Sequence, residues 1–328
     1  MSMNFSVLAI AAVAVYSAAC IAYVYRWRGR ARYASFSQYL RKSWPIFAPL
    51  NCLMYAATCA SARRPVLAAD YLKNIGLIRT HWRTIRDEAL ALQSAGAFDA
   101  TTAPGSVGYY DVGFRTFYKR GWSKFYLKWY GTNHNSARRL CPKTMALLDQ
   151  VPEIRGAMFS ILPPGAELTL HSDPMACSFR YHLGLATPNS EQCHITVDGQ
   201  PCVWHDGEDF VFDETYPHFA RNDTGEVRLI LMCDVDRPMN ALGRLINRGY
   251  RLIARGTVVP NTAEDERGVF SALFRALAPV RAWSLRLRAE RRRTYKTLKF
   301  LLNATLLTVG MGILFTALTV VEGFMFIP

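Results

Sequence analysis

Two long apolar stretches lie near the ends of the chain. Residues 5–25 and 301–321 each contain 21 residues without a charged side chain. A helix of that length spans roughly 30 Å, which is the thickness of the hydrocarbon layer of a bilayer. A buried core helix rarely stays uncharged over so many residues. We therefore predict a transmembrane anchor over residues 1–25 and a second transmembrane helix over residues 300–321.

Basic residues flank both stretches on the side that faces the middle of the chain. Arginines follow the first stretch at positions 26, 28, 30 and 32, and seven Arg and Lys residues precede the second between positions 286 and 299. Basic flanks are typical of the cytoplasmic side of a membrane span. A cleaved signal peptide would instead carry its charges before the apolar run. The flanks predict that both segments are retained and that the residues between them lie in the cytoplasm.

The region after the first stretch has a different character. Residues 43–61 are also uncharged, but two prolines interrupt them and basic pairs lie on both sides. Basic residues on both flanks suit a segment that enters and leaves on one side, so a re-entrant or interfacial element is favoured over a span. Apolar residues at helical spacing over residues 65–98 predict a helix pair that covers one side of a sheet. Residues 26–99 are thus predicted to be membrane-proximal.

From residue 156 onward the pattern changes to short runs in which apolar and polar residues alternate. In residues 179–185 the alternation places Arg180 and His182 on one face of a half-buried strand. The dipeptides Asp198-Gly199 and Asp206-Gly207 are hairpin signals. Many short antiparallel strands indicate a double-sheet jelly roll. The predicted fold class is therefore mainly β, with this domain over residues 100–240, flanking helices and terminal transmembrane helices.

Charge changes the picture most in the region after the predicted domain. The formal net charge of the chain is +14, and residues 241–299 contain fourteen basic and four acidic side chains. Basic residues alternate there with Leu, Ile, Phe and Trp, which predicts amphipathic helices on an anionic membrane surface. Nucleic-acid binding would show a similar charge but would not require two membrane anchors, so no nucleic-acid partner is predicted. A solvated charged face is the plainer alternative.

Aromatic and basic residues are dense between residues 109 and 130. Aromatic residues are more often part of a core than of a ligand site, so at least half of these are expected to be structural. The others suit the mouth of a binding site that admits an acyl chain beneath anionic head groups.

The eight cysteines include no Cys-x-x-Cys pair, which favours reduced thiols over a zinc site or disulfides.

A small set of polar residues has the spacing of a metal site. His171 and Asp173 form an i, i+2 pair, which on a strand places both side chains on the same face, and His218 follows 45 residues after Asp173. A single histidine is more often a satisfied core residue than a ligand. Two imidazoles and one carboxylate, however, leave half of an octahedron open, as in non-haem Fe(II) sites. We therefore predict His171, Asp173 and His218 as metal-binding and catalytic residues.

A lone arginine, Arg228, lies in the otherwise apolar run of residues 227–233. A buried guanidinium without an anionic partner costs several kcal/mol, on the order of any unpaired buried charge. A planar carboxylate is its best partner. Arg228 is therefore expected to bind a ligand such as a dicarboxylate.

With these motifs the sequence resembles the aspartyl/asparaginyl β-hydroxylase family of 2-oxoglutarate-dependent oxygenases, and within it the bacterial lipid A 2-hydroxylases. The similarity covers roughly residues 100 to 240, and its stretches run in order with few gaps. The matching stretches are Gly121 to Gly131, Cys141 to Thr144, Met158 to Ser160, Pro164-Gly165, His171 to Pro174, Arg180 to Leu185, Val197 to Gly199, Phe212 to Thr215, His218, and Arg228 to Pro238.

The resemblance implies a double-stranded β-helix core and a role for each polar residue. It implies that His171 and His218 bind Fe(II), with 2-oxoglutarate and O₂ as co-substrates. Arg228 with Ser160 would hold the distal carboxylate of 2-oxoglutarate, and Arg180 with His182 would lie near the carboxylate next to the keto group. In the animal protein hydroxylases a glycine stands where this chain has Asp173. Asp173 could therefore be a third ligand, a group that supports the ligands, or an anchor for water.

The resemblance also implies a substrate and a location. The expected function is hydroxylation of an acyl chain of lipid A or its precursor at the bacterial inner membrane, by a multi-pass protein whose catalytic domain is cytoplasmic. The same chemistry on an aspartyl or asparaginyl side chain, or on an ornithine-type aminolipid, remains an alternative. A membrane-bound barrel that binds lipid or metal without turnover is the alternative from another class. The expected partners are a membrane lipid and the anionic membrane surface.

Overall fold

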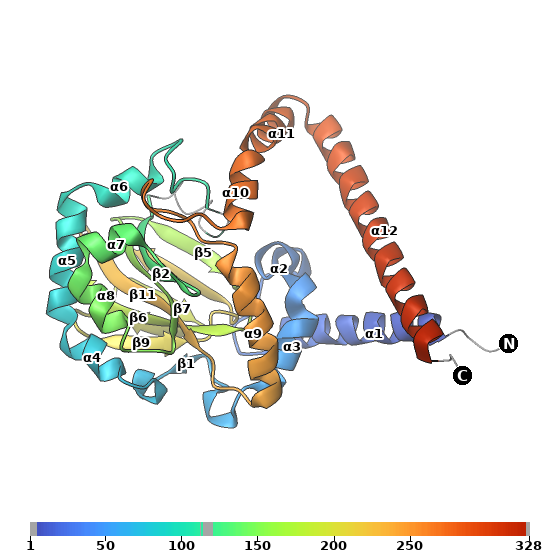
Figure 1. The fold of residues 1–328 in the computed structure, drawn as a ribbon, viewed down its shortest axis with the longest axis horizontal. Coiled ribbons are helices and arrows are strands. Elements are labelled where there is room, and N and C mark those ends of the chain that lie inside the picture. The colour runs from blue at the N-terminus through green and yellow to red at the C-terminus, as the bar shows by residue number, and fades with distance from the viewer. Residues whose placement is uncertain (1–4, 112, 114–120, 326–328) are drawn as a thin grey trace. The chain divides into compact units, whose positions relative to one another are not determined.

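The computed structural model describes residues 5–111, 113 and 121–325 (Figure 1). The chain forms two compact units. The larger unit is Tyr23–Arg275, and the smaller one combines Met1–Ala22 with Ala276–Pro328. The region predicted to be membrane-proximal, residues 26–99, therefore belongs to the same compact unit as the predicted β domain. No unit boundary lies near residue 100.

Two antiparallel sheets form the centre of the larger unit (Figure 1). In spatial order, the seven-stranded sheet contains β1 (Val66–Leu67), β9 (Asp209–Phe212), β6 (Ser178–Ala186), β11 (Arg228–Asp236), β4 (Ile154–Leu162), β2 (Ser123–Trp129) and β3 (Thr132–Asn133). The four-stranded sheet contains β5 (Glu167–His171), β10 (His218–Asn222), β7 (Cys193–Val197) and β8 (Gln200–Val203). The predicted mainly β core is confirmed.

Strand alternation creates two separate cores. On β6, Phe179, Tyr181 and Leu183 pack on the outer face of the larger sheet. Helices cover this face with Ile78, Ile85 and other apolar residues, which confirms the helices predicted within residues 65–98. The covering helices are α4 (Ile75–Thr80), α5 (Trp82–Ser94), α6 (Ala97–Thr102), α7 (Asn135–Leu140) and α8 (Pro142–Leu148).

The inner face of the larger sheet packs against the smaller sheet. Met158 and Met232 from the larger sheet and Ile195 and Ala220 from the smaller sheet belong to this second core. The alternate residues of β6, Arg180 and His182, are on the inner side of their strand. Polar residues on this side are enclosed between the two sheets, where water is scarce and charges interact strongly.

Short helices precede and follow the barrel in the larger unit. They are α2 (Phe36–Lys42), the single turns η1 (Pro45–Phe47), η2 (Ala60–Ala62) and η3 (Ala69–Tyr71), α3 (Ala48–Ala57), α9 (Ala241–Arg255) and α10 (Val269–Ala276). Helix α3 has ten residues and is therefore about 15 Å long. That is about half of the hydrocarbon thickness, so α3 is too short to cross a membrane as a straight helix. Its length favours the interfacial interpretation of residues 43–61.

The two predicted hairpin turns have different outcomes. Asp198 and Gly199 have φ angles of 51° and 83° and connect β7 to β8 in the same sheet, as expected for an Asp-Gly hairpin. The hairpin prediction for Asp206-Gly207 was wrong. The strands on its two sides, β8 and β9, belong to different sheets, so this turn carries the chain from one sheet to the other.

Gly184 on β6 leaves room for the chain where it passes from one sheet to the other at Asp206-Gly207. Replacing Gly184 tests how tightly this glycine packs against His205. A Cβ at Gly184 would lie 2.0 Å from the backbone oxygen of His205. Because backbone must move on both sides, we expect Gly184→Ala to reduce the free energy of unfolding by about 3 kcal/mol. Thermal unfolding in detergent measures the change. Gly249→Ala is the control, because nothing lies within 4 Å of its Cβ and alanine favours a helix. Equal midpoints for the two variants would contradict the prediction.

The smaller unit consists of helices. It contains most of α1 (Phe5–Arg26), together with α11 (Ala278–Glu290) and α12 (Arg292–Met325). Within the described residues, one helix is long and apolar enough to cross a membrane, over Val7–Arg26, and almost none of it is buried. This finding supports the N-terminal anchor. Residues 301–321 lie within α12, and their crossing of the membrane stays a prediction.

Candidate active site

The three residues predicted to bind metal lie together. His171 ends β5, His218 begins β10, and the two are direct partners in the antiparallel pair. Their ring centroids are 4.2 Å apart. Asp173 lies two residues beyond the end of β5, with its Oδ1 atom 3.6 Å from Nε2 of His171. Potential ligand atoms of the three residues all lie within 4.8 Å of one another, so one ion can contact all three.

Backbone carbonyls orient both imidazoles. Nδ1 of His171 donates to the carbonyl oxygen of Thr169, and Nδ1 of His218 donates to that of Tyr216, each at 2.9 Å. A carbonyl oxygen only accepts, so the proton of each neutral ring is on Nδ1 and the lone pair is on Nε2. This second hydrogen bond is the usual support of a metal-binding histidine.

Burial also keeps these histidines uncharged. Loss of solvent, together with the neighbouring His218, lowers the pKa of His171 to about 3. Burial lowers the pKa of His218 to about 4. Both rings are therefore neutral near pH 7, which is the form that binds a metal ion.

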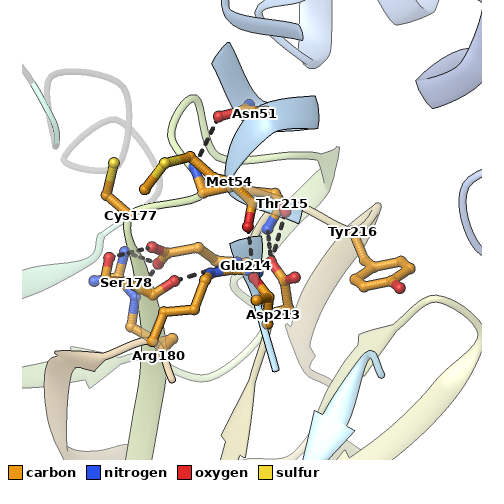
Figure 2. A network of polar contacts seen from close by, with 12 residues as sticks. Asn51, Met54, Cys177, Ser178, Arg180, Asp213, Glu214, Thr215 and Tyr216 are labelled. Atoms are coloured by element: carbon orange, nitrogen blue, oxygen red, sulfur yellow. Dashed lines mark hydrogen bonds and ion pairs between the residues drawn. The ribbon is translucent and has the colours of Figure 1, made fainter. Parts of the chain in front are cut away.

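A buried arginine orients the carboxylate of Asp173. Nη2 of Arg180 donates to Oδ2 of Asp173 at 3.0 Å, while Oδ1 is the oxygen nearest His171. Arg180 also donates through Nε to Glu214 at 2.6 Å (Figure 2). Its Nη1 pairs with Asp234 at 2.8 Å. Three carboxylates thus surround one guanidinium. Burial raises the pKa of Glu214 to about 8, so that this group can retain a proton at neutral pH.

This network changes the expected role of Arg180. The resemblance places Arg180 near a carboxylate of 2-oxoglutarate, but in the structure Asp173, Glu214 and Asp234 already occupy its guanidinium. Arg180 therefore acts on the site mainly by holding Asp173. A direct contact with a co-substrate stays a prediction.

A second group of polar residues contains buried donors that lack acceptors. Among the described residues, Nε, Nη1 and Nη2 of Arg228, Oγ of Ser160 and Nε2 of His182 are buried without a hydrogen-bond partner. Arg228 has no exposed surface, and burial lowers its pKa to about 9. A native protein seldom leaves so many buried polar atoms unpaired. The absent partner must be an acceptor, and an anion fits best.

The neighbours of these residues define which ligand would fit. The guanidinium of Arg228 lies 4.5 Å from the ring centroid of Trp204 and 5.2 Å from that of Trp122. Nε1 of Trp204 donates to Nδ1 of His182 at 3.2 Å, so a neutral His182 carries its proton on Nε2 and can donate to a ligand. A guanidinium beside two indole rings, together with a buried hydroxyl and an imidazole N–H, suits a dicarboxylate.

The three residues predicted to bind metal do lie together, but several residues that hold them in place have no role in the sequence-based prediction. Asp234 lies six residues after Arg228 on β11. Because this spacing is even, the two side chains are expected on the same face of the strand. Glu214 lies within a stretch on which the family resemblance rests, although no role was assigned to it. No local pattern in the sequence marks Trp204.

Six residues of the region predicted to form the mouth of the site lie outside the described residues. They are Phe114, Arg115, Phe117, Tyr118, Lys119 and Arg120. Within the same region, Trp122, Phe125 and Tyr126 are buried, as expected for structural aromatics.

Comparison with known proteins covers the whole candidate site. Residues 79–238 match the family model for aspartyl/asparaginyl β-hydroxylase. The ornithine lipid ester-linked acyl 2-hydroxylase of Rhizobium tropici is 35% identical over 127 residues, which are 38% of this chain and 45% of that protein. The aspartyl/asparaginyl β-hydroxylase of Homo sapiens is 32% identical over 173 residues, 51% of this chain and 22% of that protein. The matched part is less than half of each relative's length.

Proposed function

The chain belongs to the aspartyl/asparaginyl β-hydroxylase family through residues 79–238, and from this premise we propose that it is an Fe(II)- and 2-oxoglutarate-dependent dioxygenase that hydroxylates an acyl chain of a membrane lipid. One observation carries the proposal. Two neutral histidines and an aspartate that can share one ion lie in the same barrel as a buried arginine to which no described residue is hydrogen-bonded. A metal and an anionic co-substrate would complete both groups.

Three side chains would hold the iron. His171 and His218 offer Nε2 lone pairs, and Asp173 offers Oδ1 while Arg180 holds Oδ2. When bound, iron and 2-oxoglutarate supply the oxidation, in which one oxygen atom of O₂ reaches the substrate and the other enters succinate. The protein contributes the positions of the groups and excludes water from them.

The buried donors would hold 2-oxoglutarate. Arg228 and Ser160 would bind its distal carboxylate, because the planar guanidinium can form two parallel hydrogen bonds to a carboxylate. Nε2 of His182 would donate to the other end of the ligand. Trp122 and Trp204 lie beside the guanidinium and keep water away from it, which strengthens the ion pair.

A lipid substrate is supported by the anchor and by a relative. The apolar helix over Val7–Arg26 can attach the chain to a membrane, and the Rhizobium tropici relative is named for hydroxylation of a lipid acyl chain. We propose lipid A or its precursor as the substrate, on the cytoplasmic side of the inner membrane, with the anionic membrane surface as the second partner. An aspartyl or asparaginyl side chain and an ornithine-type aminolipid are the rival substrates.

Two measurements test the proposal. Purified full-length protein should convert 2-oxoglutarate to succinate when Fe(II) and O₂ are supplied together, and omission of either should stop the conversion. Extracted lipids from cells with the gene should contain one more oxygen atom on an acyl chain than lipids from cells without it. Protein that binds iron but never consumes 2-oxoglutarate would instead be a non-catalytic metal-binding barrel. Conversion without any change in the lipids would favour a protein substrate.

Asp173→Ala decides whether the carboxylate is a ligand. Oδ1 is free of Arg180 and close to both histidines, so we expect the variant to lose most of its iron. Iron per chain, measured after purification under nitrogen, is the readout. Asp223→Ala removes an exposed carboxylate paired with Arg221 and should retain the iron. Equal iron content in the two variants would leave the site with two histidine ligands, as the resemblance to the animal enzymes allows.

A further inference from the structure

Exposed apolar side chains are concentrated in two stretches of the larger unit. Among its described residues, all large apolar side chains classed as exposed lie within residues 23–53 or 242–273, apart from Leu140 and Val227. The exposed residues used below are Trp27, Phe36, Leu40, Trp44, Ile46, Leu53, Leu242, Leu245, Leu252 and Ile253. An exposed apolar area of this kind on a folded domain marks a binding surface.

The two stretches meet where α3 packs against α9. A Cβ at Gly243 of α9 would lie 2.6 Å from Cβ of Ala57, the last residue of α3. The backbone N–H of Asn240 donates to the carbonyl of Ala57 at 2.9 Å. Helices α3 and α9 lie side by side, on one side of the barrel (Figure 1). The two stretches that carry the exposed apolar residues are therefore joined through α3 and α9.

A helix on the surface of a soluble domain has a buried face and a polar face toward water, whereas α9 has a third face. At roughly 100° per residue, Gly243, Asn247 and Ala254 share one face, and all three are buried. Arg244, Arg248, Arg251 and Arg255 share a second face, and Leu242, Leu245, Leu252 and Ile253 share a third. A third face that is apolar, exposed and beside a basic face is typical of a helix at a membrane interface.

The first stretch has an apolar tip with a strained backbone. Trp44 has a φ of 53° and is 50% exposed, and Ile46 two residues later is 78% exposed. A left-handed conformation is unfavourable for a bulky residue. Exposing an indole and an isoleucine to water is unfavourable, whereas the interface of a bilayer accommodates both side chains.

The chain itself indicates which partner covers this surface. Trp27 directly follows α1, the helix that is long and apolar enough to cross a membrane. Arg30, Arg32 and Arg41 lie in the same stretch as the exposed apolar residues and suit anionic head groups. A bilayer is therefore favoured as the partner over a second copy of the chain or another protein.

The same stretch supports the loop that carries two of the metal-binding residues. Ser172, between His171 and Asp173, donates its backbone N–H to the carbonyl of Lys42 at 2.9 Å and shares a hydrogen bond with the hydroxyl of Tyr33 at 2.8 Å. Asn51, labelled in Figure 2, holds the other side of the loop. Its side chain donates to the carbonyl of Pro174 and accepts from the N–H of Ala176, each at 2.9 Å.

The stretch also supports the loop before His218. The guanidinium of Arg28 pairs with Asp213 at 2.8 Å and lies 3.6 Å from the ring centroid of Tyr216. The carbonyl of Tyr216 accepts the hydrogen bond that orients His218. Both loops that carry metal-binding residues are thus attached to the segment with the exposed apolar tip.

We propose that the exposed apolar residues of residues 27–53 and the apolar face of α9 form a bilayer-docking surface, which holds the metal site against the membrane. The docking does not depend on the reaction, but its use in presenting an acyl chain to the site rests on the proposed function. In this arrangement Trp44 and Ile46 enter the head-group region of the bilayer. They lie two and four residues after Lys42, whose carbonyl accepts a hydrogen bond from Ser172 in the loop that carries His171 and Asp173.

Photo-crosslinking of the full chain in lipid vesicles tests the docking surface. A benzophenone amino acid replaces Ile46 or Leu252, which are 78% and 76% exposed, so the replacement leaves the core intact. Leu140 and Val227 are the control positions, because they are exposed apolar residues outside the surface. In vesicles of phosphatidylethanolamine and phosphatidylglycerol we expect lipid adducts several-fold more often at Ile46 and Leu252 than at the controls. Equal labelling at the four positions, or adducts mainly with protein, would overturn the proposal.

A second measurement needs no new side chain. Lipids brominated on the acyl chains quench tryptophan fluorescence at short range. The Trp44→Phe variant should show a smaller quenched fraction than the unchanged protein, whereas Trp204→Phe, at a buried position, should show a larger one. An unchanged quenched fraction in Trp44→Phe would contradict the proposal. Lipid adducts in a protein that never consumes 2-oxoglutarate would support the docking surface and reject only the proposed reaction.

Discussion

Iron binding and hydroxylation should both disappear when His218 is replaced by alanine, and His171→Ala should have the same effect. Each change removes one of three side chains that can contact the ion, and no other His, Cys, Asp or Glu group in the described residues forms a comparable cluster. Loss of a supporting residue alone lowers metal affinity by about 10- to 100-fold, so loss of a ligand should exceed that range. Iron per chain and 2-oxoglutarate consumption are the measurements.

The matched control for these variants is His194→Ala. His194 lies on β7, directly opposite Arg221 of β10, and its Nδ1 bonds to the nearby carbonyl of Glu191. This variant should retain its iron and its activity. Circular dichroism should show the same sheet content in all three variants. Near-normal iron in His171→Ala or His218→Ala would reject the assignment of the metal site.

The two histidines also predict how stability depends on pH. Their pKa values of about 3 and about 4 in the folded protein lie below the ordinary value of 6.5. Between these values the unfolded chain binds more protons than the folded one, so the free energy of unfolding of the metal-free protein should fall as the pH decreases from about 6.5 to about 4. The double variant His171→Ala with His218→Ala should show a weaker dependence in urea titrations over this range.

The second large effect is expected at Arg228, where binding and stability should change in opposite directions. Arg228→Met removes a buried cation that has no hydrogen-bond partner among the described residues. Without ligand, the variant should therefore be as stable as the unchanged protein or more so. Its apparent KM for 2-oxoglutarate should rise on the order of 100-fold, because the carboxylate loses its charged partner.

Arg228→Lys separates charge from geometry. Lysine keeps the positive charge but cannot form two parallel hydrogen bonds to a carboxylate, so KM should rise by at least about 10-fold while iron binding hardly changes. Thermal unfolding with and without 2-oxoglutarate gives a readout independent of turnover, since a ligand that binds only the folded state raises the midpoint. The ligand-dependent increase should vanish in Arg228→Met and persist in Arg221→Met, whose arginine is on the protein surface. An unchanged KM in Arg228→Lys would identify Arg228 as a structural residue.

Local patterns were sufficient for the strands and for the principal site residues. Side chains alternate along a strand with a period of two, so residues 179–185 and 227–233 could be assigned an inner and an outer face from the sequence. The same logic explains why Arg228, a charge inside an apolar run, could be predicted as a ligand-binding residue. His171, Asp173 and His218 were grouped by chemistry, and the pairing of β5 with β10 brings them together.

The tertiary structure decided the features that depend on residues far apart in the chain. Arg180 is surrounded by Asp173, Glu214 and Asp234, and no spacing in the sequence distinguishes that arrangement from an arginine that awaits a ligand. The turn at Asp206-Gly207 has the composition of a hairpin, yet the close approach of Gly184 to His205 turns it into a crossing between sheets. Composition alone could not predict either result, because both depend on packing between segments.

The sequence by itself therefore determined the apolar N-terminal helix, the mainly β domain, and the residues proposed to bind the metal and the anion. Each follows from a periodicity or a chemistry that a short stretch contains. Only the tertiary structure decided that residues 28–51 belong to the active site, through the contacts of Arg28, Tyr33, Lys42 and Asn51 with the loops that carry the metal-binding residues. Those contacts join residues more than 100 positions apart, and a hydrogen bond over that separation exists only when the two sheets and the helices around them have packed.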